Sequence, residues 1–315
     1  MGGNIFLWVG FNLFIVFALL IDIYVFNKKP HELKIKEALV LTGFWVSLAI
    51  IFGLGVYLKW GSEYALEFAT GYVIEQSLSI DNLFVILLLF TFFKTPPAYQ
   101  QKVLIWGILG AIFFRIVFIL TGITLINNFQ FAIYILGIFL IFSSINMLFD
   151  SESNVNPDKN IVIRIFRKIM PVTESFHDGK FFIRQNKVLS ATPLFITLIV
   201  IETTDIVFAI DSIPAIIAVS HHSFIIYTSN IFAVLGLRSL YFALAGLMKL
   251  FHFLKYGLSV ILIFIGAKIL LTKVLISNNI HIDIKYDLLI IGSIIALSVF
   301  ISILSPQKVE AQNEE

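Results

Sequence analysis

The sequence predicts an all-α polytopic membrane protein with nine transmembrane helices, an N-terminus outside the cell and a C-terminus in the cytosol. Composition gives the first reason, because 59% of the 315 residues are hydrophobic and only 13% are charged. With a mean hydropathy of +0.96, such a chain is not an ordinary soluble domain. The net charge of +2 gives no reason to expect nucleic acid as a partner. The second and third reasons are the apolar runs and the placement of the basic residues.

Nine apolar runs approach or exceed the roughly 20 residues that a helix needs to cross a bilayer. They cover residues 5–26, 38–58, 64–93, 103–126, 130–149, 191–220, 225–248, 256–272 and 286–304. The first run lacks a basic leader and a small-residue cleavage site, so we expect it to be a retained helix. The third and sixth runs are longer than a perpendicular span requires, which predicts tilted or broken helices there.

The basic residues test this count of spans. Loops on the predicted cytosolic side carry 16 of the 22 Lys and Arg residues, and loops on the other side carry three. The remaining three, Arg115, Arg238 and Lys268, lie inside spans. Such an excess of cytosolic positive charge is typical of membrane proteins and fixes the orientation. We therefore expect a multi-pass protein of a bacterial inner membrane.

The one sizeable loop, residues 150–190, is basic and is predicted to be cytosolic. Its segment 160–170 reads NIVIRIFRKIM, a spacing of apolar and basic residues typical of a short interfacial helix. We interpret the loop as a linker at the membrane surface, with a regulatory domain as the alternative. The polar tail, 305–315, is predicted to be disordered.

Two parts of the sequence repeat. The stretch VIEQSLSIDNLFVI (73–86) aligns with TTDIVFAIDSIPAI (203–216) at an offset of 130, which places Glu75 on Asp205 and Asp81 on Asp211. Each is followed by a span with one arginine and then by a span that contains LIF. Units of three spans placed back to back enter the membrane from opposite sides, so this pattern predicts an inverted repeat of spans 3–5 and 6–8. Broken helices are a frequent feature of such transporters, and Pro214 supplies a candidate break in helix 6, with a break in helix 3 expected by symmetry.

The chain is thus predicted to form a single transmembrane domain. Its parts are spans 1 and 2 (5–63), the first repeat (64–149), the basic loop (150–190), the second repeat (191–272), the last span (286–304) and the tail (305–315).

Five acids lie deep in the two repeat spans. They are Glu75, Asp81, Glu202, Asp205 and Asp211. An acid at the centre of a membrane helix costs about 2.5 to 3.5 kcal/mol, so these five need partners, water or protons. We expect Arg115, Arg238 and Lys268 to act as counter-ions. If all eight groups are ionised, two negative charges remain, which is the charge that one divalent cation neutralises.

The candidate ligands are all oxygens, because the chain has no cysteine and its four methionines are not beside the acids. Glu202 and Asp205 are three residues apart and share a helix face. Asn82 and Ser212 offer supporting oxygens, although packing is the commoner role of such residues. Oxygen ligands suit Mn²⁺, Mg²⁺ or Ca²⁺ and argue against copper. Glu202 has Tyr72 as its counterpart under the offset, so we expect an asymmetric site.

The segments EQSLSIDNLFVI (75–86) and ATPLFITLIVIETTDIVFAIDSIPAI (191–216) resemble the two signature segments of the TerC family, including its Alx-like members. The family consists of integral membrane proteins named for tellurite resistance and associated with manganese efflux. The resemblance extends over roughly residues 30 to 275 and implies that the five acids are metal-site residues. It also implies a distant relation to the LysE-type transporter superfamily.

The sequence and the resemblance together predict a transporter that exports Mn²⁺ from the cytosol, with proton antiport as the expected coupling. No resident cofactor is expected, since Mn²⁺ would be the transported ion. The alternative is a membrane partner protein that supports metalation of exported enzymes or a stress-resistance complex, whose protein partners the sequence does not identify. A membrane enzyme is not expected, because intramembrane protease and hydrolase motifs such as GxGD, HExxH and GxSxG are missing.

Overall fold

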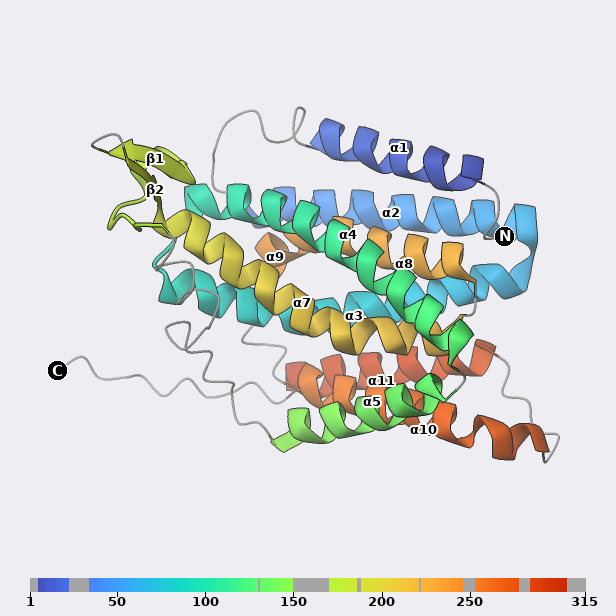
Figure 1. The fold of residues 1–315 in the computed structure, drawn as a ribbon. Helices are drawn as coiled ribbons and strands as arrows, with labels where there is room; N and C mark the ends of the chain where they lie inside the picture. The colour runs from blue at the N-terminus through green and yellow to red at the C-terminus, as the bar shows by residue number, and fades with distance from the viewer. Residues whose placement is uncertain are drawn as a thin grey trace.

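The computed structural model describes residues 5–22, 34–129, 131–149, 170–185, 188–220, 222–245, 253–277 and 284–304. Helices dominate these ranges and lie alongside one another in a bundle (Figure 1). They are α1 (Ile5–Ile21), α2 (Ile35–Trp60), α3 (Ser62–Phe92), α4 (Pro97–Asn128), α5 (Ala132–Phe149), α7 (Pro193–Val219), α8 (Ser223–Leu235), α9 (Leu237–Ala245), α10 (Leu254–Ser277) and α11 (Ile284–Leu304). Each of the nine predicted spans contains a helix.

Length and hydropathy identify five of these helices as able to cross a membrane. They are α2, α3, α7, α11 and the segment Pro97–Gly122 of α4. The bent pair α8 and α9 makes a sixth, and α1 and parts of α5 and α10 are shorter apolar helices. An all-α polytopic membrane protein is therefore confirmed, while the count of nine spans stays a prediction.

The predicted breaks in helices 3 and 6 are wrong, because α3 and α7 are each one continuous helix. Pro214 lies inside α7 and removes one backbone donor, yet the helical hydrogen bonding continues past it to the Ser220 N–H, which donates to the Ile216 carbonyl at 3.1 Å. The bend occurs in the following span, where α8 and α9 meet at Gly236 with an angle of 40° between them.

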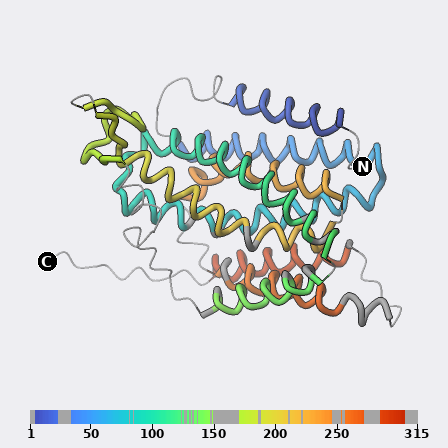
Figure 2. The backbone as a smooth tube through the Cα atoms, in the orientation of Figure 1, coloured from blue at the N-terminus to red at the C-terminus, as the bar shows by residue number. Residues whose placement is uncertain are grey.

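The bundle has a central group of helices and two flanks. Helices α3, α4, α7 and α8 pack together at the centre, α1 and α2 lie on one side, and α5, α10 and α11 form a separate group on the other (Figures 1 and 2). Two apolar side-chain clusters fill the central group, one toward each end. The polar residues described below lie between them.

A small antiparallel hairpin interrupts the all-helical architecture at one end of the bundle (Figure 1). Strands β1 (Phe182–Gln185) and β2 (Val188–Ala191) belong to the predicted loop 150–190 and lead directly into α7. Lys102 of α4 ties this region to the bundle, since its ammonium donates to the Gly179 carbonyl at 2.7 Å. The interfacial helix predicted over 160–170 falls almost entirely outside the described residues, as does the tail 305–315.

Candidate functional site

The centre of the bundle holds a buried arginine that joins two acids from different helices. Arg115 of α4 is fully buried, forms an ion pair with Glu75 of α3, and donates from Nη2 to Asp205 Oδ1 of α7 at 3.2 Å. Glu75 and Asp205 are the two positions that the sequence repeat equates. Each lies near the middle of a long apolar helix, so one guanidinium compensates for two costly charges there.

Asn230 of α8 completes this arrangement and was missed by the sequence reasoning. Its Oδ1 accepts a hydrogen bond from Arg115 Nη1 at 3.1 Å, and its Nδ2 donates to Glu75 Oε2 at 3.0 Å. The side chain is fully buried. The polar triplet TSN at 228–230, inside an otherwise apolar run, is the signal that identifies it in retrospect. We call Glu75, Arg115, Asp205 and Asn230 the polar layer.

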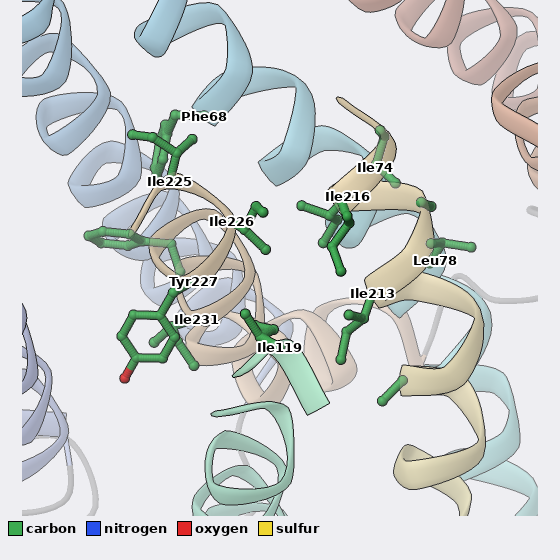
Figure 3. Close-up of a cluster of buried hydrophobic side chains, with 14 of the residues drawn as sticks. Phe68, Ile74, Leu78, Ile119, Ile213, Ile216, Ile225, Ile226, Tyr227 and Ile231 are labelled. Atoms are coloured by element: carbon green, nitrogen blue, oxygen red, sulfur yellow. The ribbon is translucent and has the colours of Figure 1, made fainter. Parts of the chain in front are cut away.

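Apolar side chains close the polar layer off toward the bundle end where α3 and α8 begin. Figure 3 shows this cluster, which brings together side chains from α3, α4, α7 and α8. Ile119 lies one turn beyond Arg115 on α4 and faces Ile213, while Ile216 faces Ile226 across the cluster (Figure 3). The predicted topology makes this the outer half of the membrane.

On the other side of the polar layer lies a small cavity of about 30 Å³, which is large enough to hold water. Glu202 and Asp205 of α7, Asn82 of α3 and Arg238 of α9 contribute to its lining. Glu202 Oε2 and Asp205 Oδ2 are buried, and neither has a hydrogen-bond partner among the residues that the structure describes. The predicted topology places this cavity toward the cytosol.

Two glycines of α4 make room for the Glu202 carboxylate. A Cβ atom on Gly110 would collide with the carboxyl group of Glu202. A Cβ atom on Gly107 would lie 3.9 Å from Glu202 Oε1, an ordinary contact distance. The carboxylate is therefore seated against the backbone of α4 at Gly110.

The remaining predicted ligands are only partly described. Asp81 and Asp211 lie in α3 and α7, but their side chains are outside the described part of the structure. Ser212 is buried, and its hydroxyl has no partner among the described residues. Within the described side chains, no group of three or more His, Asp or Glu residues is arranged to hold a metal ion. Whether the five acids form one metal site thus stays a prediction.

The predicted counter-ions do not all pair with the predicted acids. Arg238 Nη2 lies 2.5 Å from Asp22 Oδ1 at the end of α1, and Lys268 of α10 pairs with Asp287 of α11. Asp22 and Asp287 are both buried. Among the described ion pairs, Arg115 is the one cation of the polar layer, and a counter-ion role of Arg238 and Lys268 toward the five acids stays a prediction.

A second polar group lies where α3 begins and α7 ends. Glu67 Oε2 accepts a hydrogen bond from Ser220 Oγ at 2.6 Å and lies 2.9 Å from His222 Nδ1. The His222 ring also contacts the Tyr64 ring, with 4.5 Å between their centroids. Although Glu67 lies near the start of a long apolar helix, its side chain is buried.

Comparison with known proteins agrees with this membrane architecture. Residues 60–310 match the model of the integral membrane protein TerC family. An uncharacterized membrane protein of Myxococcus xanthus is 42% identical over 298 residues, which cover 95% of this chain and 92% of that protein. An uncharacterized membrane protein of Rickettsia bellii is 40% identical over 305 residues, covering 97% and 99% of the two chains.

A third relative carries a descriptive name. The "Putative membrane-bound redox modulator Alx" of Escherichia coli strain K12 is 39% identical over 311 residues, covering 95% of each chain. No solved structure matches the chain. The family model and these relatives together extend over nearly the whole sequence, and the chain belongs to the TerC family of integral membrane proteins.

Proposed function

We propose that this protein is a transporter of the bacterial inner membrane that exports a divalent metal cation, Mn²⁺, from the cytosol. One observation carries the proposal: Glu202 Oε2 and Asp205 Oδ2 are buried without a described partner, and the two residues line the same small cavity. A buried carboxylate oxygen with no partner is strongly destabilising. A cation that binds there would offset that cost.

Charge and ligand chemistry support a divalent ion. Glu75, Asp205 and Glu202 carry three negative charges when ionised, and Arg115 returns one positive charge. Arg238 adds nothing to this balance, because Asp22 already neutralises it. Two negative charges remain at oxygen ligands, which hard cations such as Mn²⁺ prefer. We assign the oxygens of Asn82 and Ser212, and the carboxylates of Asp81 and Asp211, as further ligands that complete the shell during transport.

The packing of the bundle supports alternating access from two related halves. At the contact between α5 and α10, a Cβ atom on Gly266 would lie 2.8 Å from the Gly137 carbonyl oxygen, and Ser144 Oγ donates to the Ser259 carbonyl at 2.5 Å. The aligned LIF segments are offset by 122 residues, which relates position 137 to 259 and position 144 to 266. Adding the offset to position 137 and subtracting it from position 266 gives positions 259 and 144, which form the other contact. Such a relation is expected for an inverted repeat of the kind found in LysE-type transporters.

Access to the cavity supports export. It lies in the predicted cytosolic half, on the other side of the polar layer from the apolar cluster of Figure 3. A cytosolic cation would therefore reach Glu202 and Asp205 first, and a rearrangement of the apolar cluster would release it outside. Protons that take the place of the metal on the carboxylates would complete an antiport cycle.

The name of the Alx relatives favours a second candidate function, namely a membrane partner that influences redox or metal balance through other proteins. The 315 residues contain no cysteine, so this chain brings no thiol of its own to such a role. A partner that supports metalation of exported enzymes would need those enzymes for its function. A transporter would move the cation across the membrane without another protein.

The proposal is tested by the manganese content of cells that lack this protein. We expect the deletion strain to accumulate cytosolic Mn²⁺ under manganese load and the wild-type gene to reverse this. Asp205→Asn should fail to do so, while Glu63→Gln, a matched change at an exposed acid at the start of α3, should succeed. Equal manganese content in all strains would refute the proposal.

A further inference from the structure

Arg115 occupies the place between Glu75 and Asp205 where a transported cation would find two of its ligands. We propose that Arg115 is a built-in competitor of the transported cation: its guanidinium is displaced from Asp205 when the metal binds, and it returns to Asp205 to drive the metal off. This inference rests on the proposed function. It assigns to Arg115 the role of setting affinity and release, beyond that of a static counter-ion.

The geometry at Asp205 carries the argument. Asp205 Oδ1 accepts the hydrogen bond from Arg115 Nη2 at 3.2 Å, while Asp205 Oδ2 is buried and has no partner among the described residues. One oxygen of the Asp205 carboxylate thus binds the guanidinium of Arg115, and the other is the oxygen that we assign to the transported cation. A divalent ion on Oδ2 would repel the nearby guanidinium and attract the whole carboxylate, so the two cations compete for the same residue.

Arg115 is held in a way that allows such an exchange. Its ion pair with Glu75 and its hydrogen bond to Asn230 both involve Nη1, while Nη2 alone reaches Asp205. Asn230 also bonds Glu75, so α3, α4 and α8 can retain the guanidinium when α7 withdraws Asp205. Arg115 Nε has no partner among the described residues, which leaves a donor free for a new contact after the shift.

The corresponding arginine of the second repeat does not compete in this way. Arg238 also lines the cavity, but its Nη2 lies 2.5 Å from Asp22 on α1, outside both repeats. It is a buried arginine at the same cavity, and its positive charge is already paired with the carboxylate of Asp22. Arg238 is therefore a counter-ion of Asp22 and not a competitor for Asp205.

The test is the affinity of the purified full-length protein for Mn²⁺, measured by titration calorimetry. Arg115→Gln should lower the Kd about tenfold, a typical size for coupling between two sites, because the competing charge is gone. The same variant should transport more slowly, since the metal leaves less readily.

A charge-balanced pair of variants keeps the test decisive if Arg115→Gln does not fold. Glu75→Gln with Arg115→Gln removes one charge of each sign from the polar layer. The double variant should bind Mn²⁺ more tightly than Glu75→Gln alone, because only the single variant retains the competitor for Asp205.

The outcomes separate this inference from the proposed function. If the wild-type protein binds Mn²⁺ and neither Arg115 variant binds more tightly than its reference, Arg115 is a static counter-ion and the inference is overturned. If no form binds Mn²⁺, the proposed function fails, and the inference fails with it. Tighter binding in both comparisons supports competition.

Discussion

Asp205 uses its two carboxylate oxygens for different purposes. One oxygen accepts from Arg115 across the interface between α4 and α7, and the other is buried without a described partner in a residue that lines the cavity with Glu202. Two carboxylates three residues apart on one helix face would repel each other strongly without a nearby cation. At the scale of single residues, the site therefore depends on how Glu202 is seated and on where its oxygens can lie.

Gly110→Ala tests the seating of Glu202. The new methyl group would collide with the Glu202 carboxylate and push this flexible end of the side chain out of the cavity. Because the rest of α4 need not move, the melting temperature should change little. Loss of one carboxylate ligand should raise the Kd for Mn²⁺ about tenfold, in line with the 1.4 kcal/mol that corresponds to that factor.

Gly107→Ala is the matched control for this change. Its methyl group would make only ordinary contacts, at 3.7 Å from Ile201 and 3.9 Å from Glu202 Oε1. It should leave the Kd unchanged. Equal effects of the two substitutions on the Kd would show that the position of Glu202 against Gly110 does not matter for binding.

The sequence predicted which residues bring charge into the bundle, but it did not predict which residues pair with one another. The cost of burying charge singled out the acids and the three intramembrane cations. The pairing of Arg238 with Asp22, 216 residues away in the chain, depends on how the chain at the end of α1 lies relative to α9. Hydropathy and spacing are local signals and carry no information about such a contact. The same applies to Asn230, whose role follows from two neighbouring helices.

At the scale of elements, close packing at small residues joins α5 to α10. Gly137 and Gly266 let the two helix backbones approach, and Ser144 adds a hydrogen bond to the Ser259 carbonyl. Small residues of this kind are a general means of helix association in membranes, where apolar burial gives no advantage over lipid. This pair, with α11, forms the group that flanks the central helices in Figure 1.

Gly266→Ala should destabilise this group. Its Cβ atom would lie 2.8 Å from the backbone oxygen of Gly137 and 2.8 Å from Ile141 Cγ1, and a backbone atom cannot move aside cheaply. We expect a loss of about 1 to 3 kcal/mol in the free energy of unfolding, measured by denaturant titration in detergent. Gly292→Ala on α11, where the new methyl group meets no atom within 4 Å, should cost nothing. A stable Gly266→Ala variant would contradict this view of the α5–α10 contact.

Element positions were predicted well, and element shapes were not. Hydropathy located a helix in every predicted span because burial in lipid requires long apolar helices. The breaks expected in α3 and α7 are absent, since neither the length of α3 nor Pro214 in α7 forces a helix open when its neighbours hold it. The hairpin of β1 and β2 also escaped prediction, because strands of four residues leave little periodicity to detect.

At the scale of the whole molecule, a polar layer lies between two apolar clusters. Glu75, Arg115, Asp205 and Asn230 link the four central helices, and the cavity lined by Glu202 lies beside them. Orientation rests on the Lys and Arg distribution, which the sequence provides directly.

The most direct test of this account is Mn²⁺ flux into liposomes that contain only the purified protein, followed by quenching of a trapped fluorescent indicator. We expect wild-type protein and the matched Glu63→Gln variant to carry Mn²⁺ across the membrane, and Asp205→Asn to carry none above empty liposomes. Flux that is absent in the wild type, or undiminished in Asp205→Asn, would contradict the claim that the buried carboxylates form a transport site.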